Sequence, residues 1–492
     1  MTAWLLAPSP VHARKMFSAS SRVCALGTGR QLPVQVPSAP QRAARRTRSR
    51  KRLSCSTETH VHLVGFGLAG AALAFYLCER ASQSQRLTIS VVDSAGAGCA
   101  GGATHASAGI LHPFTPRGRK IWLGDEGLIC MREILGVISE KDSSPVARRS
   151  GLLRLATTDR EAADYAAAAT QMYPQQLYWD AARSQLYIPD AWVVDAPAYV
   201  RAIRRYLERN HSDKLTLWET REVRSVADEC RRLQSLAEAS CAAVTFLVIA
   251  AGASSRLLIP SLPLTWCGGH NLVFRSQDLT WPSPEFAAAS TLTAGFSSTS
   301  APGSVPLIGH GSYLVPTPDG TRVIGGATKE YGMTATEVLK AQSRSPSEQM
   351  ARATSALRQP LSALLGRYAN LAERYAAGES PLSNTGILRD PLEALYGVRA
   401  LPPRSALGAV PLLGEIQHEA LSMLASTSIP ENTRVLYFTG LGSRGLIHHG
   451  IIGRLAADAV LRGESVVSLG SVASPTVLSS VRRAAAAAVA AS

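Results

Sequence analysis

The sequence predicts an α/β fold in which a parallel-sheet domain is interrupted by an inserted α+β domain built on a mostly antiparallel sheet. Strand-like runs end in glycine at residues 65–70, 252 and 440–445, and a parallel sheet brings such turns to one edge. Between residues 260 and 397, strand-like segments alternate with Pro/Gly turns, which is typical of antiparallel sheets. The chain has 492 residues, more than the ~250–300 of a single core, so two domains are expected.

The first strand–glycine junction has the spacing of a phosphate-binding turn. Residues 61–70 are Val-His-Leu-Val-Gly-Phe-Gly-Leu-Ala-Gly, and a helical segment, residues 71–80, follows them. In this pattern Gly65 allows a tight turn, Gly67 lets a pyrophosphate approach the backbone, and Gly70 lets helix and strand pack closely. The N-terminus of the helix then offers free N–H groups to the phosphates.

An acidic residue supports the same interpretation. A second strand, residues 87–92, ends at Asp93, where a carboxylate binds a ribose hydroxyl in dinucleotide-binding folds. We therefore expect a dinucleotide site. The alternative is a glycine-rich turn that binds nothing, with Asp93 as a solvated strand end.

The next part of the chain is expected to continue the parallel sheet and to begin the insertion. A glycine-rich loop, residues 96–109, offers backbone to a bulky ligand, and Pro113 and Pro116 after it indicate an ordered element. Further expected elements are a strand at 151–157, a helix at 160–172, a loop at 188–195, a helix at 197–207, a strand pair at 215–226 and a buried strand at 244–253.

The inserted sheet and the return of the chain complete the expected fold. Expected strands are 271–274, 312–315 and 322–327, expected helices are 347–357 and 361–377, and a last strand and helix are 434–439 and 446–461. If the three glycine junctions share one parallel sheet, they converge on one long ligand. FAD suits this arrangement better than NAD, because its flavin end must reach far from the pyrophosphate.

The first 57 residues have the composition of a targeting segment. They contain 11 of the 51 Lys and Arg residues and no Asp or Glu, and they are rich in Ser, Ala and Pro. We expect a transit-like, disordered leader that directs the protein to the chloroplast, with the mitochondrion as the alternative. A basic arm that binds nucleic acid is the other possibility.

Composition also argues against several classes of protein. Of the formal net charge of +15, only +4 remains after residue 57, with 40 basic against 36 acidic residues, so a nucleic-acid partner is not expected. No segment reaches the ~18 apolar residues of a membrane span. The eight cysteines and 11 histidines show no spacing of a metal-ligand set, so no metal is expected.

Taken together, these motifs resemble the FAD-dependent D-amino acid oxidase superfamily, which includes glycine oxidase and sarcosine oxidase. The likeness is closest to its plant and cyanobacterial members and covers residues 59–461. The matching segments, in the order of the family, are 64–70, Asp93, 101–109 with Leu111-His112-Pro113, 250–252, 323–330, 397–399 and 440–445.

The resemblance implies roles for individual residues. Gly65, Gly67, Gly70 and Asp93 would hold the ADP half of FAD. The remaining residues expected to contact the cofactor are Thr104, His105, Ala106, Gly109, Gly252, Gly442, Ser443, Arg444 and Gly445.

Arg399 matches the arginine that binds the substrate carboxylate, a role that suits the planar guanidinium fork. His105 is the second candidate catalytic residue. Arg399 could instead pair with a structural acid, Asp390 or Glu393. Glu330, at a strand end beside Lys329, could contact substrate or be a solvated strand end.

The same likeness divides the chain into a Rossmann-like FAD-binding domain and a substrate domain. The FAD-binding parts are expected at 58–150, 206–260 and 397–465, the substrate parts at 151–205 and 261–396, and a disordered tail at 466–492.

The expected function is oxidation of the C–N bond of a small amino acid or secondary amine that carries a carboxylate. The expected partners are this substrate and O2 or another electron acceptor. Two alternatives remain: a tRNA-modifying enzyme that acts on a carboxymethylaminomethyl group, and a non-catalytic flavoprotein that assists assembly of another complex. The sequence leaves open the amine, the acceptor, covalent attachment of FAD, the leader cleavage site and the oligomeric state.

Overall fold

The computed structural model describes residues 58–95, 102–138, 145–240, 244–279, 305–375, 388–417 and 432–466, which belong to one compact unit. The expected leader at 1–57, the tail beyond residue 466 and residues 96–101 of the glycine-rich loop lie outside this part. Within it, no helix has the length and apolar character needed to cross a membrane.

Six strands form the first sheet in the order β19-β20-β10-β1-β2-β9, and all except β19 run parallel. The central strands are rich in Val, Ile and Leu because helices cover both of their faces. The three glycine junctions therefore follow the adjacent strands β1, β10 and β20, as the sequence predicts. The bounds are β1 Thr59–Val64, β2 Leu87–Asp93, β9 Leu215–Thr220, β10 Val244–Ile249, β19 Leu412–Ile416 and β20 Thr433–Thr439.

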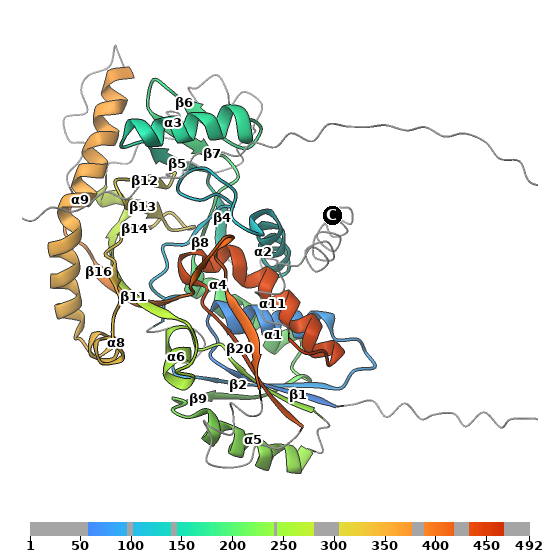
Figure 1. The fold of residues 1–492 in the computed structure, drawn as a ribbon. Helices are drawn as coiled ribbons and strands as arrows, with labels where there is room; N and C mark the ends of the chain where they lie inside the picture. The colour runs from blue at the N-terminus through green and yellow to red at the C-terminus, as the bar shows by residue number, and fades with distance from the viewer. Residues whose placement is uncertain are drawn as a thin grey trace, which may run out of the picture. The chain divides into compact units, whose positions relative to one another are not determined.

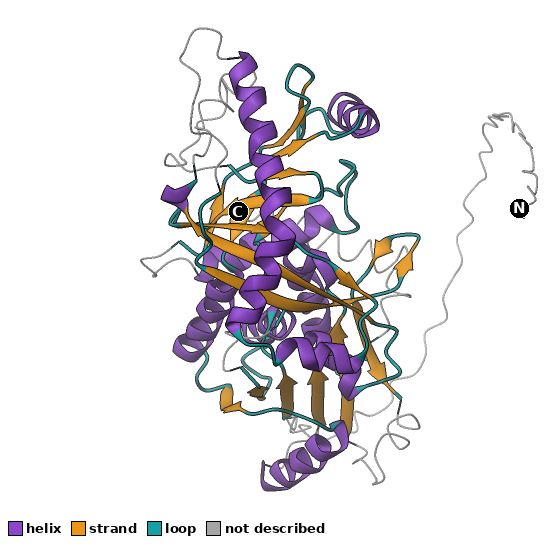
Figure 2. Ribbon diagram, turned by 90° about the vertical axis from the view of Figure 1, so that its left-hand side faces the viewer, coloured by secondary structure: helices purple, strands orange, loops and turns teal. Residues whose placement is uncertain are grey.

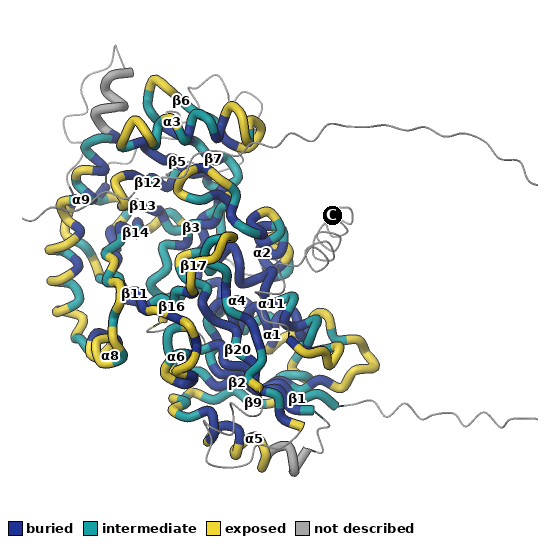
Figure 3. The backbone as a smooth tube through the Cα atoms, viewed as in Figure 1, coloured by how far each residue is buried: buried dark blue, intermediate teal, exposed yellow. Residues whose placement is uncertain are grey.

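Helices cover both faces of this sheet (Figure 1). On one face, four helices share a core with Val61 and Leu63 of β1. On the other face, α5 packs against Val64. Figure 3 shows that buried backbone concentrates in the sheet and in α1 and α11. The helices of the first face are α1 Leu68–Arg80, α2 Gly124–Ile138, α4 Ala196–Asn210 and α11 Gly445–Arg462; α5 is Val226–Ser240, and the short α6, Ser255–Leu258, follows β10.

Nine strands form a second sheet in the order β15-β11-β14-β13-β12-β5-β7-β6, with β16 on β11. All neighbours pair antiparallel except β5 and β12, so the inserted sheet is mostly antiparallel, as expected. The bounds are β5 Leu152–Leu155, β6 Tyr178–Asp180, β7 Gln185–Ile188, β11 Thr265–Arg275, β12 Leu307–Gly309, β13 Ser312–Pro316, β14 Arg322–Gly326, β15 Glu330–Tyr331 and β16 Glu393–Leu401.

The long helix α9, Pro346–Tyr375, crosses the second sheet (Figure 2). Its apolar residues, among them Leu357 and Leu361, pack on Phe274 and Leu314 of the strands. Helix α8, Ala335–Gln342, packs near β11 and β16, and α3, Asp159–Ala167, with a wider turn over Ala168–Met172, packs near β5 and β7.

Two small sheets complete the fold. β3, Ile110–Leu111, and β4, Ala147–Arg149, both pair with β8, Trp192–Val194. The predicted loop at 188–195 is therefore wrong in part. A strand of three residues forms there by pairing with β3 and β4, and because these partners lie far away in the sequence, no local pattern indicates the strand. β17, Arg404–Ser405, and β18, Gly408–Ala409, form a hairpin.

Two further predictions are corrected. Residues 215–226 hold one strand, β9, rather than a strand pair, because α5 begins at Val226 with the Ser225 hydroxyl accepting from Asp228 N. The helices expected at 347–357 and 361–377 are one helix through Pro360. Its apolar face continues across the proline, and packing on the sheet outweighs the missing backbone hydrogen bond.

Candidate active site

A cavity of about 1040 Å³ lies at the carboxyl ends of β1, β10 and β20 and extends to the second sheet. Its wall contains nearly all of the site residues expected from the sequence. These are Gly65, Gly67, Asp93, Thr104, His105, Ala106, Gly109, Gly252, Arg399, Gly442, Ser443, Arg444 and Gly445. Gly70 lies behind the wall, in α1.

The turn after β1 depends on two glycines. Gly65 has a φ of +98°, and a Cβ there would lie 2.7 Å from the Ala250 carbonyl oxygen. At Gly70 a Cβ would lie 2.0 Å from the Gly65 carbonyl oxygen, so the helix passes closer to the turn than any side chain allows. Gly67 precedes α1 and has no side chain to cap the helix, while the first helical N–H, at Leu68, donates to Thr104 Oγ1 at 3.4 Å.

Asp93 is fixed beside this turn by the backbone. Its Oδ2 accepts from Phe66 N at 2.7 Å and its Oδ1 accepts from Ala95 N at 2.8 Å. Each carboxylate oxygen keeps a further lone pair for a ligand hydroxyl.

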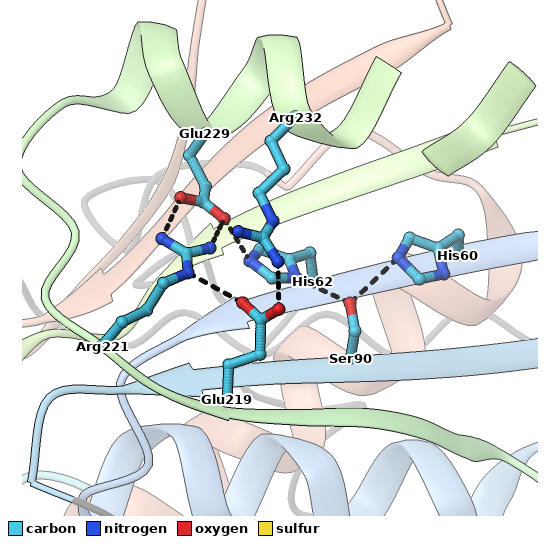
Figure 4. Close-up of polar contacts among 7 residues, drawn as sticks. All are labelled: His60, His62, Ser90, Glu219, Arg221, Glu229 and Arg232. Atoms are coloured by element: carbon cyan, nitrogen blue, oxygen red, sulfur yellow. Dashed lines mark hydrogen bonds and ion pairs between the residues drawn. The ribbon is translucent and has the colours of Figure 1, made fainter. Parts of the chain in front are cut away.

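A partly buried ion cluster, drawn in Figure 4, adjoins this end of the cavity through Arg221. Arg221, in the cavity wall, donates to Glu219 at 2.7 Å and to Glu229 Oε2 at 2.8 Å. Nε2 of His62, in β1, lies 2.9 Å from Glu229. Burial alone would raise the pKa of Glu229, but its contacts with His62 and Arg221 lower it to about 2. The charged carboxylate thus fixes Arg221 near Asp93, since Thr220 pairs with Asp93 across β9 and β2.

The described part of the glycine-rich loop, residues 102–109, is fixed by the second sheet. Asn271 Nδ2 of β11 donates to the Ala106 carbonyl at 2.7 Å. A Cβ on Gly397 of β16 would lie 2.8 Å from Ala106 Cβ, so this strand touches the loop. His105 Nδ1 is buried, and no described residue bonds it.

The glycine junction after β20 contacts the junctions that follow β10 and β1. Thr439 Oγ1, at the end of β20, donates to the Gly252 carbonyl at 2.9 Å. A Cβ on Gly445 would lie 3.2 Å from Leu68 Cδ1 at the start of α1. Arg444 faces the cavity, and burial, then the charge of Arg404, lowers its pKa.

Arg399 lies on β16 with its guanidinium toward the cavity. Its Nη2 lies 3.6 Å from Cys267 Sγ, and no carboxylate in the described ranges is within ion-pair distance. The alternative that Arg399 pairs with Asp390 or Glu393 is wrong, because Asp390 pairs with Arg358 at 2.9 Å and Glu393 with Arg322 at 3.3 Å. Glu330 and Lys329 are not in the cavity wall; Glu330 lies 3.8 Å from His270 Nδ1.

Several residues of the wall were not assigned a role from the sequence. Tyr313 donates to Asn271 Oδ1 at 2.8 Å, and burial raises the pKa of Tyr313 to about 12 although the nearby Arg399 charge lowers it. Arg154 and His112 also line the cavity. The lone charge in Leu-Leu-Arg-Leu of β5 could have indicated Arg154, whereas no local pattern marks Tyr313 or Asn271.

Comparison with known proteins gives one family. Residues 60–459 match the profile of the family described as FAD dependent oxidoreductase (DAO). Among curated proteins no match is found.

Solved structures share the fold. Glycine oxidase from Geobacillus kaustophilus is 20% identical with a TM-score of 0.50, covering 82% of this chain and 95% of that one. Iminodiacetate oxidase (IdaA) from Chelativorans sp. BNC1 is 16% identical with a TM-score of 0.51, covering 82% and 96%. Glycine oxidase from Bacillus cereus ATCC 14579 is 16% identical with a TM-score of 0.50, covering 83% and 96%.

Proposed function

The chain belongs to the FAD dependent oxidoreductase family, and from this premise we propose that it oxidises the C–N bond of a small amine carrying a carboxylate. One observation carries the proposal: Arg399 presents a guanidinium to the cavity, and no described carboxylate pairs with it. The neighbours named glycine oxidase and iminodiacetate oxidase act, by their names, on amines of this kind.

The residues of the cavity fit FAD. At Gly67 a Cβ would meet only Thr104 Oγ1 within 4 Å, at 3.2 Å, so the backbone there is open to a pyrophosphate. His105 Nδ1, buried and unbonded by any described residue, is available to a polar atom of the flavin. The cavity, at about 1040 Å³, also exceeds what a small amine needs.

In this proposal the first sheet holds the cofactor. The turn at Gly65 and Gly67 would hold the pyrophosphate, with Gly70 letting α1 pack close behind it, and Asp93, near Arg221, would bind a ribose hydroxyl. Thr104, His105, Ala106 and Gly109 would contact the flavin, and Gly252 and Gly442 to Gly445 would hold the rest of the cofactor. When bound, FAD would supply the hydride acceptor for oxidation of the carbon next to the amine nitrogen, and water would hydrolyse the imine product to a carbonyl compound and an amine or ammonia.

The second sheet binds and orients the substrate. Arg399 binds the carboxylate, and charge-assisted hydrogen bonds are about twice as strong as neutral ones. The hydrogen bond between Tyr313 and Asn271 fixes these two side chains in the cavity wall, and Asn271 also donates to the Ala106 carbonyl of the glycine-rich loop. This connects the place where the carboxylate binds to the loop that lies along the cofactor, which favours a fixed orientation of the reacting carbon.

Replacement of Arg399 tests the proposal. Arg399→Ala should lower kcat/KM for the amine by about 100-fold or more, because the substrate loses its anchor, while the visible flavin spectrum persists. Arg322→Ala, in the same sheet but paired with Glu393 at the surface, is the matched control and should retain activity. Unchanged kcat/KM in Arg399→Ala would contradict the assigned role.

We also propose a cellular location for the protein. The acid-free, Arg-rich composition of residues 1–57 supports import into the chloroplast, and closeness to plant and cyanobacterial members belongs to the same proposal. A fusion of residues 1–57 to a fluorescent protein tests it, and retention of that fusion in the cytosol would contradict it.

A further inference from the structure

We propose that Arg154 and His112 form a second carboxylate site in the cavity, so that the preferred substrate is an amine with a distal carboxylate on an extended arm. This rests on the proposed function, since Arg399 takes the carboxylate next to the amine. The two sites together specify an amino dicarboxylic acid.

Arg154 is a buried cation with no described carboxylate within ion-pair distance. It is 7% exposed, lies in β5 and lines the same cavity as Arg399. Burial lowers the pKa of its guanidinium, an effect that the nearby Tyr165 and Glu161 oppose, and its Nε has no hydrogen-bond partner among the described residues. Glu161 acts on Arg154 only from beyond ion-pair distance, and its Oε2 accepts from Thr157 N at 2.8 Å and from Thr157 Oγ1 at 2.6 Å. A buried charge without a counterion is costly, so the site favours an anion.

His112 adds a second donor that points at the first. Its Nδ1 accepts from Phe114 N at 3.1 Å, which places the proton of the neutral ring on Nε2. This Nε2 lies 3.3 Å from Arg154 Nη2, and a guanidinium nitrogen can only donate. Burial, with the charges of Arg154 and Arg444, keeps the pKa of His112 well below its usual value, so the ring stays neutral. Two donors therefore converge with no acceptor between them.

A carboxylate suits these donors. Its two oxygens can accept from Arg154 and from His112 at once, and its single negative charge matches the single positive charge of the pair. The surrounding wall is apolar, with Ile110, Phe114 and Ile121, which favours a methylene arm leading to the carboxylate.

The strand register sets the length of the arm. Arg154 pairs with Ile308, and Ile308 pairs with Tyr313. Residues directly opposite on neighbouring strands point to the same face, so Arg154 and Tyr313 face the cavity together, two strands or about 10 Å apart at their Cα atoms. Tyr313 in turn reaches Asn271 across Gly326, whereas Arg399 on β16 lies opposite Cys267, four residues before Asn271 on β11. The second carboxylate thus lies beyond the reach of a one-carbon arm.

Matched substrates test the inference with the holoenzyme. The pairs glutamate and norvaline, 2-aminoadipate and norleucine, and 2-aminopimelate and 2-aminoheptanoate differ in a terminal carboxylate against a methyl group, and both enantiomers are used. We expect kcat/KM for the best dicarboxylic member to exceed that of its partner by about 10- to 100-fold. Arg154→Met should bring this ratio close to one without changing flavin content, and Arg154→Lys should restore part of it.

Arg322→Met, a surface arginine of the same sheet, is the control and should keep the wild-type ratio. A ratio that persists in Arg154→Met, or an equal loss for both members of a pair, would overturn the inference. If no amine reduces the flavin, the proposed function fails, and the site is then judged by binding alone.

Binding is measured by the melting temperature of the holoprotein with succinate, adipate, pimelate or hexanoate. Adipate or pimelate should raise it more than hexanoate, and Arg154→Met should abolish the difference. Equal effects of adipate and hexanoate, or the same protection by sodium chloride, would contradict a carboxylate site.

Discussion

Glu229 shows how single side chains hold the end of the cavity next to Asp93. In β1, Val61 and Leu63 point to the helices of one face, while His62 points to α5, where a buried glutamate meets it. The same carboxylate binds Arg221 on the cavity wall. One buried charge therefore joins the core of the sheet to the site.

Glu229→Gln removes this charge and should destabilise the protein. Arg221 keeps Glu219, so we expect a loss of about 2 kcal/mol rather than the larger cost of a fully isolated buried charge. Glu222→Gln is the control, because Glu222 is exposed and pairs with Arg224 at the surface. The melting temperature of the holoprotein measures both, and equal values for the two variants would contradict the assigned role.

Most residues that the sequence assigns to the cofactor line the cavity, and they could be proposed from the sequence because their spacing is set by local backbone geometry. The turn at Gly65 and the strand end at Asp93 are examples, since each lies within a few residues of the element that fixes it. Tyr313, Asn271 and Arg154 come together only through pairing of β5, β12, β13, β14 and β11. This strand register cannot be predicted from a single sequence.

The contact of α1 with the turn after β1 gives a test at the level of an element. Gly70→Ala places a Cβ 2.0 Å from the Gly65 carbonyl oxygen, so the helix must move away from the turn. We expect the variant to lose FAD on dilution, with a Kd raised at least about tenfold, equivalent to ~1.4 kcal/mol.

Gly136→Ala in α2 is the matched control for this substitution. A Cβ there meets no atom within 4 Å, and the residue is exposed. Because alanine favours helix by up to ~1 kcal/mol over glycine, this variant should keep FAD and gain some stability. FAD affinity unchanged in Gly70→Ala would show that close packing of α1 is not required.

The wrong predictions of secondary structure have two kinds of reason. The start of α5 is indicated locally by a capping residue, Ser225, three residues before Asp228, but the alternating pattern of residues 215–226 suggested strands instead. β8 had no local indication, because its partners β3 and β4 come from elsewhere in the chain. Local patterns thus fixed the core of the parallel sheet and left short strands undetected.

For the molecule as a whole, the two sheets meet at the cavity, and each contributes a different part of the proposed chemistry. The parallel sheet supplies the turns for the cofactor, and the antiparallel sheet supplies Arg399 and Asn271. The fold class follows from the sequence because glycine junctions and Pro/Gly turns mark the two kinds of sheet. The domain bounds given from the sequence stay a prediction.

Buried histidines should make the whole protein acid-sensitive. Burial is the main cause that lowers the pKa of His60, His448 and His449 to about 4 each, against 6.5 in an unfolded chain. Between pH 6.5 and 4 the unfolded chain binds more protons than the folded protein does. The free energy of unfolding therefore decreases as the pH is lowered, by up to about 1.4 kcal/mol per pH unit for each histidine.

The measurement is the melting temperature from pH 7.5 to 4.5, which should fall steeply below pH 6.5. His211→Gln removes a partly exposed histidine and leaves these three in place, so its curve should keep the steep fall. A flat curve between pH 6.5 and 4.5 would contradict the neutral state of the buried rings.

The central claim, that this chain is a flavoenzyme that oxidises an amine next to a carboxylate, is tested most directly by one visible spectrum. The full-length protein is purified, and small amino acids, N-methyl amino acids and the dicarboxylic series above are added without oxygen. The account predicts a flavin band that one of these amines bleaches. A flavin band that none of them bleaches would contradict the proposed reaction and favour the RNA-modifying or assembly alternatives.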